Sequence, residues 1–512
     1  MIPVVDTLGM RAADRHIIEE LGLPSVVLME QAAAAVNAAV EARAERRDLV
    51  VVLCGRGNNG GDGLAMARQR HASGGLVEAV LVAHPGELSE DAAVQWELAR
   101  RFGVPRRVLT KQDLRALEAL LNRAAVVVDA LYGTGLDRPL SGLPAQVVEL
   151  VNALDGEVVA VDIPSGLSGN GGVPLGPAVA ADVTVTFGAL KWVHVLAPAA
   201  ILCGDVVVAH IGIPQAAVEK AASGFVLEAQ DVADWLPYRT LDAHKGHFGH
   251  LLVVAGRRGR AGAAALAAKA GVRAGAGLVT VATAVDAVSP IQARVPEAMV
   301  DPLPTGEDGS VSGEGIEESL RKATAVAVGP GLGLGEGPRR LLSRILELWS
   351  GPLVLDADAL TLLAGQLEKL RGRTAPTVLT PHPGELARLL GITPAQVQED
   401  RPAWARRTAE RCGGTVVLKG FHTLVAEAEG PVWVNPTGSP GLASGGAGDV
   451  LAGLIGAFLA QGLPAKQAAA LGVFLHGRAA ELAGKRFPGA VPASVVASFV
   501  PKAEAELREL VE

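Results

Sequence analysis

Short runs of β-branched residues alternate with helical stretches along the whole chain, and this alternation constrains the fold most. In the first half the apolar runs cover residues 49–54, 76–82, 125–131 and 157–163. The stretches between them carry apolar residues at helical spacing, over residues 64–71, 91–102 and 143–154. Apolar strands separated by helices are typical of a parallel sheet that is covered on both faces. We therefore expect a doubly wound, Rossmann-like three-layer α/β domain.

Two further helices are expected before the first of these strands. One covers residues 8–21 and ends at Gly22 and Pro24, and the other runs from an N-cap at Ser25 toward Arg43. These helices would pack outside the sheet or against a second subunit. The exposed faces of this pair indicate a homo-oligomer.

The α/β alternation ends with an apolar run at residues 205–213 and then begins again. The second series of strands is expected at residues 250–256, 278–283, 325–331, 352–358, 376–382 and 414–420. We place the boundary near residue 220, which gives domains at 1–220 and 221–512. The two halves share no residue-level similarity, so a fusion of two different parallel-sheet modules is more economical than a duplication.

Charge and cysteine content exclude several classes of protein. The 46 basic and 54 acidic residues give a net charge of -8 without long runs of one sign, which disfavours a nucleic-acid binder. The three cysteines are far apart and support neither a disulfide framework nor a cysteine metal site. No signal peptide or membrane span is apparent, and we expect a cytoplasmic protein with no membrane partner.

The segment GRGNNGGDG at residues 55–63 lies between an expected strand and an expected helix. Glycines here permit tight turns and expose N–H groups to a ligand phosphate at a helix N-terminus. An ordinary glycine turn between strand and helix is the alternative. Asn58, Asn59 and Asp62 favour a ligand site, because a plain turn does not need their polar groups.

Two acids end neighbouring strands, Asp129 in VVVDALYGTGL and Asp162 in VVAVDIPSGL. In open α/β sheets the carboxyl ends of strands border the ligand crevice, so both acids should converge with the glycine-rich segment. Oxygen donors from Asn59, Asp129 and Ser165 would suit a monovalent or hard divalent cation. For Asp129, a helix-capping role is equally compatible with the sequence.

These segments, with M-R-x-x-D, LPSVVLMEQA and FGALK, resemble the epimerase-type domain of bifunctional NAD(P)H-hydrate repair enzymes. The resemblance implies that the first domain interconverts the R and S forms of nicotinamide nucleotide hydrated at C6, with K+ at the site. It implies that Asn59, Asp129 and Ser165 bind the K+ and that Asp162 is a catalytic residue that contacts the substrate. The other residues that it assigns to the substrate are Asn58, Asn59, Gly60, Gly61, Asp62, Gly133, Thr134, Gly135, Leu136, Asp137 and Arg138.

In the second half, the segment GSPGLASGGAGDVLAGLIGAFL at 438–459 places glycines directly before a long apolar helix. Residues 445–448 can direct N–H groups and the helix dipole toward a developing negative charge, with Asp449 beside them as a candidate base. Phosphoryl transfer to a hydroxyl needs this combination. Close packing of the helix on the sheet through small residues is the alternative.

Four more segments follow expected strands, at residues 329–335, 356–360, 381–385 and 418–426. They should border the same crevice. His382 lies between two prolines, which favours a rigidly placed hydrogen-bonding group over a solvated loop histidine.

Together these motifs resemble the ribokinase-like, ADP-dependent hydrate dehydratase that forms the second half of the same repair enzymes. The resemblance implies that ADP, with Mg²⁺, is used to dehydrate the S hydrate and yields AMP and phosphate. It assigns the hydrate to Ala263, Gly331 or Gly333, His382 and Asp449, with Asp449 as the catalytic base. The residues that it assigns to the adenine nucleotide are Lys419, Gly420, Phe421, His422, Thr423 and Gly448.

We therefore expect a two-domain α/β enzyme, an isomerase joined to a lyase, that returns hydrated NADH and NADPH to the active cofactor. Two alternatives remain open at this point. One is a ribokinase-like kinase of a vitamin or small alcohol, and the other gives the first half a non-catalytic binding role. A phosphorylated product that persists would indicate the kinase.

Overall fold

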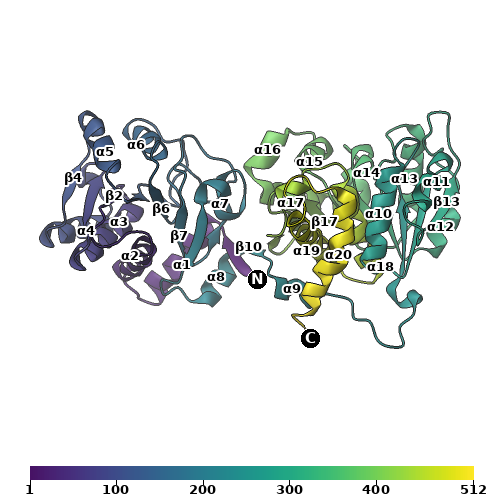
Figure 1. Cartoon of the computed structure of the whole chain (residues 1–512), viewed down its shortest axis with the longest axis horizontal. Helices are drawn as coiled ribbons and strands as arrows, with labels where there is room; N and C mark the ends of the chain where they lie inside the picture. Colours follow the sequence, from purple (N-terminus) through teal and green to yellow (C-terminus); the bar gives the residue numbers. More distant parts are fainter. Residues whose placement is uncertain (512) are drawn as a thin grey trace. The chain divides into compact units, whose positions relative to one another are not determined.

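The computed structural model describes residues 1–511, and the chain forms two compact units (Figure 1). The N-terminal unit comprises Ile2–Gly224, and the C-terminal unit comprises Met1 and the chain from Phe225 onward. A short strand, β10 (Ala222–Val226), spans the division. Both units contain a mainly parallel sheet that packs against helices, so the α/β fold class is confirmed.

The N-terminal unit contains a parallel seven-stranded sheet. In spatial order its strands are β4 (Arg106–Val108), β3 (Val77–Leu81), β2 (Val50–Cys54), β5 (Val126–Ala130), β6 (Glu157–Val161), β7 (Val183–Phe187) and β9 (Asp205–Ala209). Outside this sheet, β1 (Ile2–Val5) pairs in parallel with β8 (Leu190–Lys191). Neither β4 nor β7 was expected from the sequence. The first is short and arginine-rich, whereas the valine–threonine alternation of the second is a strand signal that was overlooked.

Helices cover both faces of this sheet, as the alternation along β2 shows. Val50, Val52 and Cys54 belong to one apolar core, while Val51 and Leu53 belong to another. The helices of the unit are α1 (Thr7–Arg15), α2 (Ser25–Glu41), α3 (Asn58–Ala72), α4 (Glu90–Arg101), α5 (Leu114–Leu121), α6 (Leu143–Asn152), α7 (Trp192–Val195) and α8 (Gln215–Ala221). Side chains of α2 and α3 contribute to the first core, and those of α5 and α6 contribute to the second.

Three expected helix boundaries were wrong. The glycine-rich segment is not a loop before the helix, because α3 already begins at Asn58. Ser25 is the first residue of α2 rather than its N-cap, since Pro24 precedes it with an extended backbone. The first helix is also not a single α-helix, because α1 ends at Arg15 and a π-helical turn follows over His16–Glu20.

The sheet of the C-terminal unit is parallel over most of its width. Its order is β13 (Met299–Leu303), β12 (Leu278–Ala284), β11 (His250–Val254), β14 (Ala325–Val328), β15 (Leu353–Leu355), β16 (Thr377–Leu379), β17 (Thr415–Leu418), β18 (Leu424–Ala426) and β19 (Val432–Val434). The expectation of a purely parallel sheet was wrong at one side, because β18 and β19 are antiparallel. They are joined to their neighbours by short connections, which only antiparallel strands can use.

A helical layer buries one face of this second sheet. Its core is rich in alanine and glycine from α10 (Ala261–Arg273), α18 (Ala447–Ala460), α19 (Ala465–Gly484) and α20 (Ala493–Arg508). A Cβ atom on Gly453 of α18 would lie 2.1 Å from the Ala267 carbonyl oxygen of α10, so only glycine permits this approach. The remaining helices are α9 (Ala229–Ala233), α11 (Val288–Gln292), α12 (Glu317–Lys322), α13 (Glu336–Leu348), α14 (Asp358–Leu362), α15 (Pro383–Leu390), α16 (Pro394–Glu399) and α17 (Arg401–Cys412).

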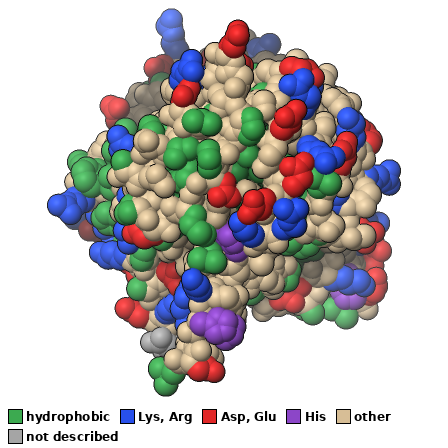
Figure 2. Space-filling view, turned by 90° about the vertical axis from the view of Figure 1, so that its right-hand side faces the viewer, with side chains coloured by type: hydrophobic (Ala, Val, Ile, Leu, Met, Phe, Trp, Pro, Cys, Tyr) green, Lys and Arg blue, Asp and Glu red, His purple; other side chains and the backbone are tan. Residues whose placement is uncertain are grey.

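On the face of the molecule drawn in Figure 2, basic and acidic side chains lie intermixed with apolar ones. This mixture is typical of an ordinary solvated surface. None of the helices in the described chain is both long enough and apolar enough to cross a bilayer.

Candidate active sites

The N-terminal unit contains a cavity of about 660 Å³ at the carboxyl ends of β2 and β5, which are adjacent strands. Its lining residues are Arg11, Arg56, Gly57, Asn58, Asn59, Leu131, Tyr132, Gly133, Thr134, Gly135, Leu136, Asp137, Arg138, Pro139, Leu140, Ser141 and Pro144. Both predicted substrate segments, 58–62 and 133–138, therefore contribute to one cavity. Within the described chain Arg11, Arg56 and Arg138 form no ion pair, and they outnumber the one carboxylate of the lining, Asp137, so the cavity presents net positive charge to a ligand.

The first turn of α3 forms part of the cavity wall. A Cβ atom on Gly60 would lie 1.9 Å from the Gly55 carbonyl oxygen, so glycine is required for α3 to start this close to β2. Gly60 and Gly61 are buried behind the wall. The Asn59 Nδ2 atom is buried and has no hydrogen-bond partner in the described residues. An unpaired buried amide is costly, which indicates a group that a ligand completes.

A buried ion pair lies beside this wall. Asp162 directly follows β6 with a positive φ of 63°, and its Oδ1 atom lies 2.8 Å from Lys191 Nζ. Its Oδ2 atom lies 3.3 Å from the position that a Cβ on Gly133 would occupy, and Asn59 Oδ1 lies 3.0 Å from the same point. Burial would raise the pKa of Asp162, but the charge of Lys191, together with the hydrogen bonds from Lys191 and Thr186, outweighs it and lowers the pKa. The structure thus brings Asn59, Gly133 and an ionised Asp162 together.

Two further carboxyl groups near Asp162 have pKa values that are raised rather than lowered. Burial raises the pKa of Asp14 on α1 to about 6, and the charge of Asp162 contributes to the rise. The pKa of Asp62 is raised by burial and by the charges of Asp162 and Asp14. Neighbouring carboxyl groups with pKa values displaced in opposite directions are typical of acid–base catalysis. Sequence reasoning missed Asp14, although M-R-x-x-D was noticed.

Asp129 and Ser165 also lie together. Asp129 Oδ1 accepts a hydrogen bond from Ser165 Oγ at 2.6 Å, and Oδ2 accepts one from the Ser165 backbone N–H at 2.7 Å. The Leu131 N–H donates to Oδ1 at 3.2 Å. Asp129 is fully buried, and burial raises its pKa against these hydrogen bonds. Asp129 therefore also fixes the chain that follows β5 and β6.

The C-terminal unit contains a cavity of about 690 Å³ at the carboxyl ends of its central strands. Its lining includes His382, Lys419, Gly420, Phe421, His422, Thr423, Gly448 and Asp449, together with Asp356, Ala357, Pro383, Glu385, Asn435, Pro436, Thr437, Gly438, Ser439, Pro440, Leu442, Ala443, Ser444, Ala447, Leu451, Val473, His476 and Gly477. All six residues predicted for the adenine nucleotide are in this set. The lining contains one lysine and three carboxylates, so acidic groups outnumber basic ones, whereas basic groups outnumber acidic ones in the first cavity.

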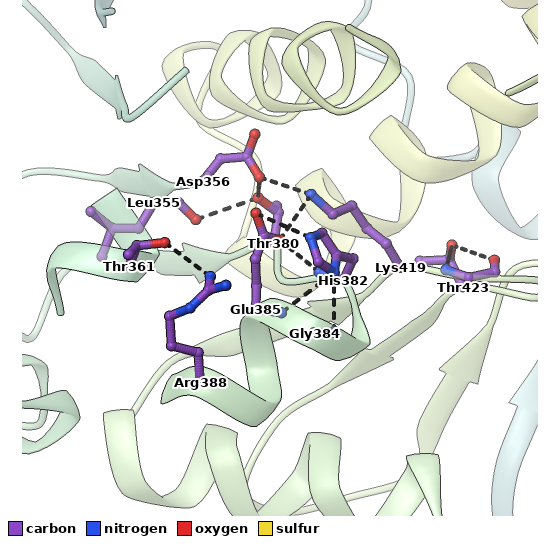
Figure 3. Close-up of polar contacts among 11 residues, drawn as sticks. Leu355, Asp356, Thr361, Thr380, His382, Gly384, Glu385, Arg388, Lys419 and Thr423 are labelled. Atoms are coloured by element: carbon purple, nitrogen blue, oxygen red, sulfur yellow. Dashed lines mark hydrogen bonds and ion pairs between the residues drawn. The ribbon is translucent and has the colours of Figure 1, made fainter. Parts of the chain in front are cut away.

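Figure 3 shows how three adjacent strand ends meet in the wall of this cavity. Asp356 follows β15, and its Oδ1 atom accepts hydrogen bonds from Thr380 Oγ1 at 2.7 Å and from Lys419 Nζ at 2.9 Å. Lys419 Nζ also lies 3.6 Å from Glu385 Oε2. His382 caps α15, because its Nδ1 atom accepts from the Gly384 N–H at 3.1 Å.

Asp449 lies in the first turn of α18. Its pKa is raised to about 7 by burial and then by the negative charge of Asp356, while Lys419 acts in the opposite direction. A carboxyl group with this pKa can exchange a proton at neutral pH, which suits a general base.

A buried arginine holds the loop that the nucleotide was predicted to contact. Arg401 donates hydrogen bonds to the carbonyl oxygens of Phe421 at 2.7 Å and Leu418 at 3.2 Å. Phe421 remains half exposed and contacts the ring of His422. Sequence reasoning missed Arg401, since nothing in its local pattern distinguishes it from a surface arginine of α17.

Ala263, Gly331 and Gly333 lie outside the described lining of the cavity. A Cβ on Gly331 would lie 3.1 Å from that of Ala263, so these two are adjacent. The Gly333 N–H donates to Asp358 Oδ2 at 2.8 Å, and the charge of Asp358 contributes to the raised pKa of Asp449. Gly333 thus connects to Asp449 through Asp358.

Comparisons with known proteins agree with this arrangement. The family described as YjeF-related protein N-terminus matches residues 25–193, and the family described as NAD(P)H-hydrate dehydratase matches residues 251–502. The bifunctional NAD(P)H-hydrate repair enzyme Nnr of Moorella thermoacetica is 40% identical over 99% of this chain and 98% of its own. The chain belongs to the family of bifunctional NAD(P)H-hydrate repair enzymes. The predicted isomerase–lyase function is confirmed, and the kinase alternative is not supported.

Solved structures also match the dehydratase half. A hypothetical protein from Streptococcus mutans is 28% identical with a TM-score of 0.50, covering 56% of this chain and all of its own. An ADP/ATP-dependent NAD(P)H-hydrate dehydratase from Bacillus subtilis, co-crystallized with ATP/Mg²⁺, is 31% identical with a TM-score of 0.49, covering 55% of this chain and 97% of its own.

Proposed function

We propose that the domain at 221–512 dehydrates the S hydrates of NADH and NADPH with ADP, and that the domain at 1–220 interconverts the R and S hydrates. The observation that carries the first assignment is Asp449, a carboxyl group with a pKa of about 7 at the N-terminus of α18. The same cavity contains the 419–423 loop. A base beside an anion-binding helix end and a nucleotide loop suits phosphoryl transfer to a hydroxyl.

In the dehydratase, Asp449 takes the proton of the C6 hydroxyl, whose oxygen bonds to the β-phosphorus of ADP while AMP leaves. The phosphate then departs from C6 with the C–O electron pair, and the neighbouring ring carbon loses a proton to water. Residues 419–423 and Gly448 bind ADP, and Ala263, Gly331 or Gly333, and His382 contact the hydrate. Mg²⁺ would be bound with ADP and would offset the diphosphate charge, since the cavity already contains the carboxylates of Asp356, Glu385 and Asp449.

In the epimerase, residues 58–62 and 133–138 bind the nucleotide, and Asp162 contacts the hydrate as the catalytic residue. The arginines of the cavity and the unpaired Asn59 amide support nucleotide binding here. A hydrate carbon bonded to nitrogen can lose water and regain it on the opposite ring face. That exchange needs one group to donate a proton and another to accept one, which suits the differing carboxyl groups around Asp162.

K+ is proposed for the epimerase, with Asn59, Asp129 and Ser165 as its ligands. Amide, carboxylate and hydroxyl oxygens are the donors that a hard cation takes, and Asp129 and Ser165 are in direct contact. K+ would supply a fixed positive charge beside the substrate.

The test incubates mixed R and S hydrates with ADP and Mg²⁺ and follows the absorbance of reduced nicotinamide. Full recovery is expected, with one phosphate released per cofactor restored. Recovery of the S fraction alone would refute the epimerase, and a persistent phosphorylated product would refute the dehydratase.

We also propose a cytoplasmic homo-oligomer. All three cysteines are free thiols, which suits a reducing compartment. Exposed Leu8 and Val27 near α1 and α2 support self-association, which sedimentation velocity would detect.

A further inference from the structure

Asp356 is a buried carboxylate to which the proposed reaction gives no role. It is 1% exposed, follows β15 directly, and precedes Ala357, whose φ of 49° is uncommon for a residue with a side chain. Both Asp356 and Ala357 line the cavity. A strained residue beside a candidate site warrants a functional explanation.

The two oxygens of Asp356 face different partners. Oδ1 accepts from Thr380 Oγ1 and from Lys419 Nζ, so it ties together the ends of β15, β16 and β17 (Figure 3). Oδ2 lies 3.9 Å from the point that a Cβ on Gly448 would occupy, and Lys419 Nζ lies 3.4 Å from it. The ion pair therefore lies directly against the first turn of α18, one residue from Asp449.

The charges around Asp449 come from several elements. They are Asp356 after β15, Asp358 on α14, Glu385 on α15 and Lys419 after β17, with His382, His422 and His476 also lining the cavity. Burial lowers the pKa of His476 to about 4, so it is neutral at working pH. Lys419 is the only lysine or arginine in this set, and Asp356 forms the shorter of its two ion-pair contacts there.

We propose that Asp356 is a positioning residue for dehydration, which holds the Lys419 ammonium under α18 and sets the balance of charge at the base Asp449. The inference rests on the proposed dehydratase function. Without Asp356, Lys419 would have only the longer contact to Glu385. The carboxylate would then no longer oppose ionisation of Asp449, and the lysine would be free to move toward bound phosphate.

The test measures the pH dependence of S-hydrate dehydration at saturating ADP and Mg²⁺, each variant scaled to its own plateau. In the parent enzyme the rate should fall below about pH 7, where Asp449 gains a proton. Asp356→Asn should move this acid limb down by about one pH unit, which raises the scaled rate at pH 6 about fivefold. Lys419→Met should move the limb in the opposite direction.

Two more variants separate charge from structure. Thr380→Val removes a hydrogen bond to the same oxygen without changing charge, so its limb should stay in place. The double variant Asp356→Asn/Lys419→Met removes both charges together, which buried pairs tolerate better than loss of one partner, and its limb should return near that of the parent. Identical limbs in all variants, or a Thr380→Val shift as large as that of Asp356→Asn, would overturn the inference. A parent enzyme that does not dehydrate the hydrate would instead refute the proposed function.

Discussion

Lys191 Nζ donates hydrogen bonds to Asp162 Oδ1 at 2.8 Å, to Thr186 Oγ1 at 2.8 Å and to the Phe187 carbonyl oxygen at 3.0 Å. The three hydrogens of the ammonium group thus have three acceptors, and its side chain is 1% exposed. A buried pair this complete keeps Asp162 ionised in a place where an isolated carboxylate would take up a proton.

Lys191→Met should leave the Asp162 charge buried and unpaired. We expect a loss of about 3 kcal/mol or more in the free energy of unfolding of the N-terminal unit, and loss of epimerisation. Chemical denaturation would measure the first effect and R-hydrate repair the second. Lys220→Met, at an exposed lysine of α8, is the control and should change neither. Unchanged stability in Lys191→Met would contradict the importance of the pair.

Asp449→Asn should retain the fold and ADP binding but slow dehydration about a hundredfold or more, because the general base is lost. It should also stabilise the protein at pH 8. The pKa of Asp449 is raised to about 7 in the folded state. At higher pH, folding therefore buries a charged carboxylate that is solvated in the unfolded chain, which costs stability. The gain should therefore shrink as the pH falls from about 7 toward the ordinary carboxyl pKa of 3.8, below which both states are protonated. Thermal unfolding at pH 8 and pH 5 would measure it, and lower stability at both values would instead indicate a structural role.

Asp129→Ala should slow R-hydrate repair to the rate of spontaneous epimerisation, while S-hydrate repair with ADP stays normal. The substitution also leaves the N–H groups of Ser165 and Leu131 without their acceptor, at a cost of about 1–3 kcal/mol for each unsatisfied group. A potassium titration of R-hydrate repair separates these effects. If repair and its potassium dependence survived in this variant, the proposed cation site would have to be abandoned.

Arg56→Gln should raise the KM of epimerisation about tenfold and leave kcat nearly unchanged, because a guanidinium facing phosphate contributes uniform binding. The loss should shrink at high ionic strength, where such contacts are screened. Arg115→Gln, on the exposed side of α5, provides the matched control. Equal KM values for the two variants would argue against phosphate binding at Arg56.

The positions at which polar side chains converge could be predicted from the sequence. Their individual hydrogen-bond and ion-pair partners could not. Asp162 and Asn59 follow separate strands, and the rule for strand ends predicted that they meet, as the structure shows. Asp162 and Lys191 are 29 residues apart in the sequence, and Lys191 also donates a hydrogen bond to Thr186. No local sequence pattern could reveal this pair. The functional roles of these residues remain predictions.

Helix starts were harder to predict than strands. Residues 58–63 contain three glycines and two asparagines, which intrinsic propensity assigns to a loop, yet α3 includes all of them. Close approach to β2 requires the glycines, and tertiary packing therefore overrides the local preference. Asp356 and Glu385 had a usable signal, since each follows a strand in the motifs DADAL and PHPGE, but acids in such motifs also cap helices.

The contact between Gly453 and Ala267 bears on how this protein can evolve. Because α18 approaches α10 with no room for a Cβ atom, the helix that carries Asp449 cannot slide or rotate to absorb a larger side chain. A saturation mutagenesis screen for function would thus score Gly453 with the catalytic positions, although it lies a full turn away from Asp449 and is not among the residues that line the cavity. Intolerance to substitution along α18 would in that case reflect its close packing against α10 rather than a catalytic role of the substituted residue.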